Sequence, residues 1–79
     1  MKLRRPQDVL SLPRGDLHFV KDGLPIELVS MEEYAFHAAE VVVANGVQES
    51  FETRADVIVF AMRNLEWGLA KHGYTAEIA

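Results

Sequence analysis

Residues 54–69, which read RADVIVFAMRNLEWGL, carry apolar side chains on two opposite sides of any helix that they form. At 100° per residue, Ile58, Leu65 and the apolar residues at helical spacing around them make one stripe. Phe60 and Trp67 lie almost opposite that stripe, and their separation of seven residues aligns them along the helix. A surface helix normally has one apolar side. The second side therefore needs a cover, which is either the rest of this chain or another protein.

The helix itself is predicted at residues 54–72. Thr53 with Asp56 three positions later is an N-cap signal, and Gly73 is a typical stop. The six consecutive apolar residues Val57–Met62 also allow a buried strand followed by a short helix. The helical spacing that continues through this run favours the helix.

A first helix is predicted at residues 31–44. Ser30 and Glu33 have the spacing of a capping box, and the Asn-Gly pair at 45–46 favours a left-handed stop. The valines at 41–43 lower helix propensity, so an extended last turn is the alternative.

This first helix also has apolar residues on two sides. Phe36 and Val43, again seven residues apart, lie on the side opposite the main stripe. The main stripe consists of Met31, Tyr34, Ala38, Val41 and Val42.

Residues 17–29 are predicted to form a β-hairpin. The short apolar runs Leu17–Val20 and Ile26–Val29 flank an Asp-Gly pair at 22–23, and this pair is the strongest local hairpin signal. Pro25 cannot donate to a ladder and belongs at the start of a strand or on an edge.

These elements predict an α+β fold in one small domain of residues 1–79, with an N-terminal β-hairpin followed by two antiparallel α-helices. Residues 1–16 contain two prolines and a glycine and are expected to be an irregular lead-in. Five apolar residues at the two ends are expected to anchor onto the core: Val9, Leu10, Leu12, Tyr74 and Ile78.

A chain of 79 residues has a small core, which disulfides, a metal or a partner subunit usually supplement. Because the sequence contains no cysteine, disulfides and thiolate metal sites are excluded, and a partner is the remaining supplement. The longest apolar run is six residues, and no apolar run follows the basic start. The sequence thus predicts a cytoplasmic protein without a membrane span or a secretory signal.

The net charge of −4 is unevenly distributed. Residues 1–22 hold five basic and three acidic residues, a balance of +2, whereas residues 23–79 hold three basic and nine acidic residues, a balance of −6. An acidic body repels phosphate backbones, which argues against direct nucleic-acid binding.

Glu33, His37 and Glu40 share one helix face, and carboxylates and imidazole at this spacing are metal-ligand types. An acidic solvated face is the alternative and the preferred interpretation. No nucleophile and base have the spacing of a catalytic set, and the glycines form no phosphate loop. We therefore expect no enzyme activity, no cofactor and no metal.

The sequence predicts a small acidic protein-binding or regulatory module, of the kind that includes inhibitors, antitoxins and phage-encoded proteins. Its partner is expected to be another protein, a second copy in a homodimer, or both. The alternative is a small metal-dependent enzyme centred on His37. The residues expected to contact a partner are Glu32, Glu33, Phe36, Glu40, Val43, Phe60, Arg63 and Trp67.

Overall fold

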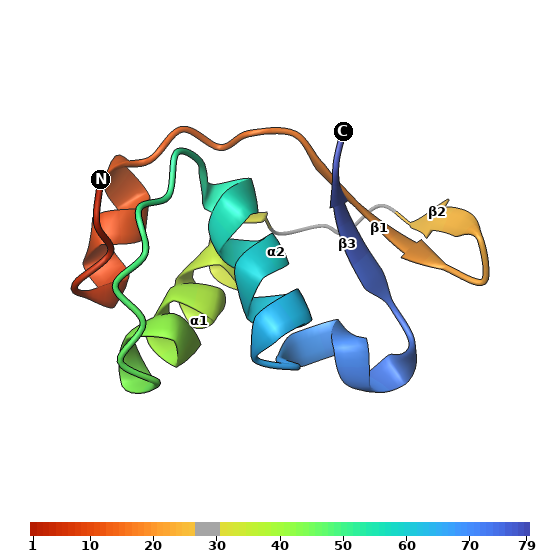
Figure 1. The fold of residues 1–79 in the computed structure, drawn as a ribbon. Helices are drawn as coiled ribbons and strands as arrows, with labels where there is room; N and C mark the ends of the chain where they lie inside the picture. The colour runs from red at the N-terminus through yellow and green to blue at the C-terminus, as the bar shows by residue number, and fades with distance from the viewer. Residues whose placement is uncertain (27–30) are drawn as a thin grey trace.

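The computed structural model describes residues 1–26 and 31–79. It has two main α-helices and a three-stranded antiparallel sheet in a small α+β domain (Figure 1). Ser30 and residues 27–29 lie outside the described residues, so the capping box of Ser30 and the end of the predicted second strand stay predictions. The elements, with η for a 3-10 helix, are η1 (Pro6–Ser11), β1 (Leu17–Lys21), β2 (Leu24–Ile26), α1 (Met31–Ala44), α2 (Arg54–Asn64), η2 (Gly68–His72) and β3 (Thr75–Ile78).

β1 and β2 form a hairpin around the Asp-Gly pair. Asp22 and Gly23 have φ angles of 54° and 78°, and Lys21 pairs with Leu24 across this two-residue turn. Positive φ at both central residues is typical of a type I′ turn, whose twist matches that of paired strands. Pro25 lies in β2, an edge strand, where a residue without an N–H is tolerated.

β3 is a strand that the sequence analysis did not predict. It pairs antiparallel with β1, with Phe19 opposite Ala76 and Leu17 opposite Ile78, which gives the strand order β2-β1-β3. The predicted order of a hairpin followed only by two helices is therefore wrong, because the strand β3 follows the helices. Tyr74 packs against the core as expected, but Ile78 is 51% exposed and does not.

α1 ends at the predicted Asn-Gly pair. The N–H of Val47 donates to the carbonyl of Val42 at 3.1 Å, and the N–H of Gly46 donates to the carbonyl of Val43 at 3.0 Å. This pair of bonds is the Schellman motif, and Gly46 adopts its left-handed position with φ 72°. The last turn is helical, so the extended alternative for residues 41–43 is wrong.

α2 begins at the predicted cap. The N–H of Asp56 donates to Thr53 Oγ1 at 3.1 Å, and the N–H of Thr53 donates to Asp56 Oδ2 at 3.0 Å, which completes a capping box. Val57–Met62 is helical, so the strand alternative is wrong.

The predicted end of α2 at residue 72 is also wrong, because the helix stops at Asn64. Glu66 adopts a left-handed φ of 49°, and the N–H of Trp67 donates to the carbonyl of Ala61 at 3.3 Å. The helix thus closes on a left-handed cap without a glycine, and residues 68–72 continue as η2.

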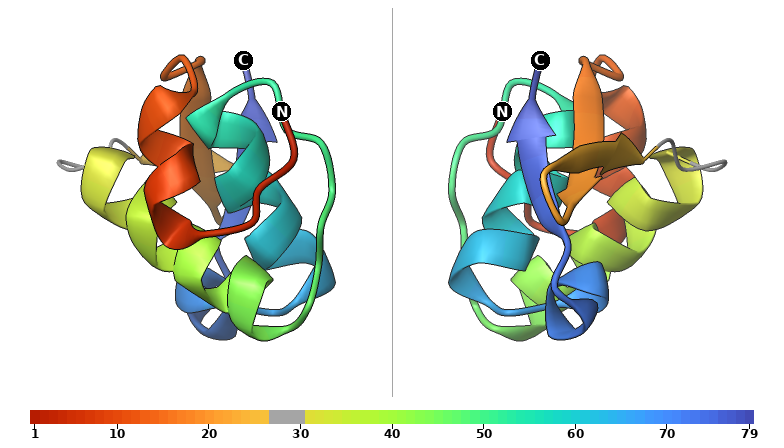
Figure 2. Two further views of the ribbon diagram at one scale, coloured as in Figure 1. Left: turned by 90° about the vertical axis from the view of Figure 1, so that its left-hand side faces the viewer. Right: turned by 90° about the vertical axis from the view of Figure 1, so that its right-hand side faces the viewer.

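The two helices are not antiparallel. Residues 45–53 return along the outside of the molecule, so both helices run downward in Figure 1 and in the left view of Figure 2. Short connections produce antiparallel neighbours. This connection of nine residues can span about 30 Å when extended, which is more than the roughly 21 Å length of a 14-residue helix.

Residues 1–16 are more ordered than predicted. They contain η1, and the backbone of residues 1–3 lies beside residues 49–51, with the N–H of Phe51 donating to the carbonyl of Met1 at 3.0 Å. Val9 and Leu12 are buried as expected, whereas Leu10 is 55% exposed. Leu3, which was not expected to anchor, is also fully buried.

The second side of α2 is covered by this chain. α2 lies between α1 and β3 (Figure 1), and η1 packs against both α1 and the start of α2, where Arg54 donates to the carbonyls of Val9 and Leu10. The ring of Phe60 contacts Phe51 of the returning segment, edge to face, at a centroid distance of 5.5 Å. Trp67 lies beyond the helix end, so it does not share a helix line with Phe60.

Candidate functional site

The exposed side of α1 carries the acidic face predicted from the sequence. His37 Nδ1 lies 3.3 Å from Glu40 Oε1, and His37 Nε2 lies 3.8 Å from Glu33 Oε1. All three side chains are about half exposed or more. Glu32 points elsewhere and pairs with Arg54 Nη1 at 3.4 Å.

Next to this face, three aromatic rings make successive contacts. Phe19 of β1 lies 5.9 Å from Tyr34 of α1, and Tyr34 lies 5.8 Å from Trp67, with the last two rings inclined at 68°. Phe19 is buried, whereas Tyr34 and Trp67 are half buried. The buried ring supports the other two, which remain accessible.

The early end of α2 places Trp67 in this cluster. A helix continued to residue 72 would align Trp67 with Phe60, away from Tyr34. The left-handed turn at Glu66 redirects the chain, and Trp67 follows it with an extended backbone at φ −90° and ψ 151°. A non-glycine residue in the left-handed region costs roughly 1–3 kcal/mol, and such residues concentrate at functional sites.

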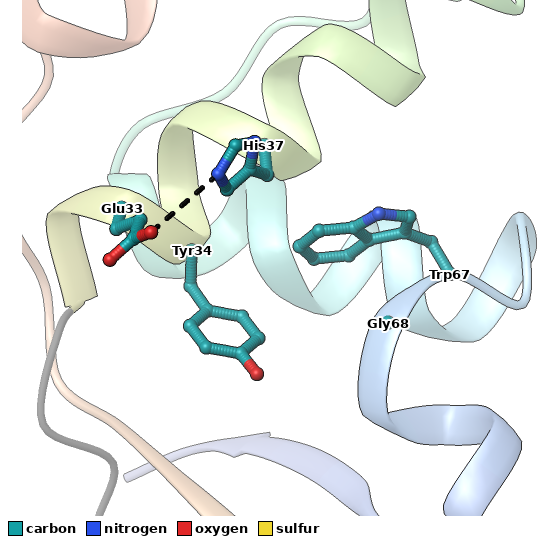
Figure 3. Close-up of a pocket in the computed structure, with 5 residues that line it drawn as sticks. All are labelled: Glu33, Tyr34, His37, Trp67 and Gly68. Carbon is teal, nitrogen blue, oxygen red and sulfur yellow. Dashed lines mark ion pairs between the residues drawn. The ribbon is translucent and has the colours of Figure 1, made fainter.

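Beside these side chains lies an open pocket of about 280 Å³, lined by Glu33, Tyr34, His37, Trp67 and Gly68. In Figure 3 the rings of Tyr34 and Trp67 lie on two sides of the space, and the Glu33–His37 ion pair lies along α1 beside it. The pocket therefore combines two aromatic rings, a carboxylate and an imidazole from α1 with the loop that follows α2.

The chemistry of this pocket suits binding. Among the described residues, none of the buried ones is polar or charged, and no buried side-chain nitrogen or oxygen lacks a partner. Desolvated acids and bases are a frequent mark of catalytic sites. The pocket instead offers solvated charges beside π faces.

The metal alternative is not favoured by the geometry. Within residues 1–26 and 31–79, no group of three or more His, Cys, Asp or Glu side chains is arranged to hold a metal ion. The imidazole of His37 lies between two carboxylates, one at each nitrogen. Metal ligands would instead converge on one point.

The predicted partner-contact residues do not form one surface. Glu33 and Trp67 meet in the pocket, and Glu40 is linked to it through His37. Phe60 packs against Phe51, away from the pocket. Of the others, Glu32 and Arg63 are exposed, and Phe36 and Val43 are half buried against the core.

Tyr34 and Gly68 line the pocket and were not among the predicted contact residues. Tyr34 was assigned to the core stripe because its spacing from Ala38 and Val41 is helical. The apolar stripe correctly places Tyr34 on the side of α1 that faces the core. The stripe does not show that the ring of Tyr34 lies at the edge of the core and stays half exposed. Gly68 carried no signal, because its role depends on the break in α2.

Comparison of the chain with family models, with curated proteins and with solved structures found no match. Within the described residues, no helix has the length and apolar character needed to cross a membrane.

Proposed function

We propose that this protein is a small acidic protein-binding module that acts by occupying a basic surface of a partner protein, as inhibitors and antitoxins do. The observation that carries the proposal is the exposed acidic side of α1, which continues into a pocket with aromatic walls. The module acts by contact and without catalysis. We place it in the cytoplasm, because the absence of cysteine suits a reducing compartment.

Charge supports a basic partner. Glu32, Glu33 and Glu40 expose 55%, 69% and 48% of their side chains, and residues 23–79 carry six more acidic than basic residues. Complementary potentials steer encounter and set the orientation of two proteins. They also disfavour partners with acidic surfaces.

The aromatic residues support a specific contact point within that surface. Tryptophan and tyrosine are enriched among residues that dominate binding energy, especially where they line pockets. Trp67 and Tyr34 meet both conditions. The acidic face thus supplies attraction, and the rings supply a place where one partner side chain is desolvated.

A homodimer, which the sequence also predicts, would use another surface. In a two-fold dimer each surface patch meets its own copy. The acidic side of α1 would then bring Glu33 and Glu40 of both chains together, and like charges across an interface are costly.

The test is affinity capture from the native host, with identification by mass spectrometry. The wild-type protein is compared with Glu33→Lys/Glu40→Lys, which reverses the α1 face, and with Glu49→Lys/Glu52→Lys, which makes the same charge change on the returning segment. We expect one protein with a basic surface to be recovered by the wild type and the control, and lost with the α1 variant. Recovery by all three, or recovery of no protein, contradicts the proposal. Circular dichroism checks that each variant is folded.

A further inference from the structure

We infer that the pocket between α1 and the loop after α2 binds one arginine side chain of the partner protein. This inference rests on the proposed function and names what the pocket recognises. The pocket is formed by Glu33, Tyr34, His37, Trp67 and Gly68.

The two aromatic rings provide the first part of the recognition. Tyr34 and Trp67 are 5.8 Å apart and inclined at 68°, so their faces point in different directions around the space. A cation within about 6 Å of a ring face is attracted by the ring quadrupole, and tryptophan attracts it most strongly. A guanidinium group is also flat and weakly hydrated, so it stacks on such faces more readily than an ammonium group does.

Glu33 provides the second part. Its side chain is 69% exposed, and the imidazole nitrogen beside it, His37 Nε2, lies at 3.8 Å. This distance is longer than a hydrogen bond, so the carboxylate can accept N–H groups from a ligand. The fork of an arginine matches a carboxylate with two parallel hydrogen bonds, whereas lysine offers a point charge.

The size of the pocket provides the third part. Pockets for drug-sized ligands and cofactors occupy roughly 300–1,000 Å³. A volume of about 280 Å³ lies below this range and suits one long side chain. A side chain presented by a protein surface can enter from outside, because both rings and Glu33 remain partly exposed.

Trp67 is the only tryptophan of the chain, so its fluorescence reports on the pocket directly. The probe is the blocked tripeptide acetyl-Gly-Arg-Gly-amide, titrated into the full protein. The control is its citrulline counterpart, which has nearly the same shape and no charge. We expect a saturable change in Trp67 emission with the arginine peptide and about tenfold weaker binding of the citrulline peptide. Added salt should weaken the arginine complex.

Two variants locate the binding. Glu33→Gln should weaken the arginine peptide about threefold, as expected for a partly solvated charge pair. Glu49→Gln removes an exposed carboxylate from the returning segment and should leave the affinity unchanged. Tyr34→Leu should abolish binding of the arginine peptide. Binding to this variant is measured by the NMR chemical shifts of the Trp67 indole, and circular dichroism checks that the variant remains folded.

Equal binding of the arginine and citrulline peptides, or no saturable change, overturns the inference. Equal binding of acetyl-Gly-Lys-Gly-amide overturns the selection of arginine. If light scattering shows a dimer that the arginine peptide dissociates, the pocket is filled by a second copy, and the assignment to a different partner is wrong. A captured basic partner with no peptide binding overturns this inference alone, whereas peptide binding with no captured partner overturns the proposed function alone.

Discussion

At the scale of single residues, Asp8 shows how one carboxylate organises the start of the chain. It accepts the N–H groups of Arg5 and Arg4 at 3.0 and 3.1 Å, and its Oδ1 lies 3.1 Å from Arg5 Nη2. The backbone bonds from Arg5 and Arg4 lower the pKa of Asp8 below its ordinary value of 3.8. η1 therefore begins on a carboxylate cap that requires the ionised form.

The Asp8 cap predicts an acid-dependent loss of stability. A carboxyl whose pKa is lower in the folded state stabilises the fold above its unfolded pKa, and this contribution disappears as pH falls through the folded pKa. We expect Asp8→Asn to lower the melting temperature at neutral pH and to have less effect below pH 3.8. Thermal unfolding from neutral pH to about pH 2 measures this, with Asp16→Asn as the control outside η1. A constant difference between Asp8→Asn and the wild type at every pH would contradict the cap.

Glu66 adopts a backbone conformation that is unfavourable for a residue with a side chain. Its φ of 49° lies in the left-handed region, where only glycine is free of steric cost. We expect Glu66→Gly to stabilise the protein by roughly 0.5–1 kcal/mol, measured by denaturant unfolding. If α2 continued to residue 72, the same change would place glycine inside a helix and destabilise it by about 1 kcal/mol. The sign of the change therefore decides between the two structures, and Glu66→Val, which tolerates this φ poorly, should destabilise.

At the scale of elements, Thr53 determines where α2 begins. Its hydroxyl accepts the N–H of Asp56, and the Asp56 carboxylate accepts the N–H of Thr53. We expect Thr53→Ala to destabilise the protein by about 1 kcal/mol, because it leaves an N–H of the first turn without its partner. Thr53→Ser keeps the hydroxyl and should remain near wild type. The midpoint of urea unfolding measures both, and equal midpoints for the two variants would show that the capping box contributes nothing.

The elements that the sequence predicted are those with local signals. Asn45 and Gly46 end α1 through bonds to the preceding turn, and Thr53 and Asp56 start α2 through bonds to each other. The Asp-Gly turn likewise brings together strands that are adjacent in sequence. In each case the residues that specify the structure lie within a few positions of it, so the pattern is visible in the sequence.

The elements that the sequence did not predict depend on distant partners. β3 has four residues, and it pairs with β1, which lies more than 50 positions earlier in the chain. The end of α2 brings Trp67 to Tyr34, a contact across more than 30 positions. The sequence predicted Glu33, Glu40 and Trp67 as contact residues, but it did not predict that Trp67 meets Tyr34, because the break in α2 brings the two rings together.

At the scale of the whole molecule, the segments that cover α2 give Phe60 and Trp67 different environments. Phe60 and Trp67 looked equivalent while both were placed on one helix line. In the structure Phe60 is covered by Phe51 on residues 45–53, whereas Trp67 forms the wall of a pocket. The small core is thus supplemented by the chain's own returning segment, and Trp67 stays half exposed at the pocket.

Matched truncations of these two residues should therefore have opposite effects. We expect Phe60→Ala to destabilise by about 2 kcal/mol, less than the roughly 3–5 kcal/mol of a fully buried phenylalanine, and to leave partner capture unchanged. Trp67→Ala should cost less stability, because Trp67 contacts the half-buried Tyr34 at a pocket wall whereas Phe60 contacts the buried Phe51, and it should abolish capture. Urea unfolding and capture from the host, each measured on both variants, test the pair. A folded Phe60→Ala protein that no longer binds the partner would show that residues 45–53 move aside on binding, and Phe60 would then belong to the interface.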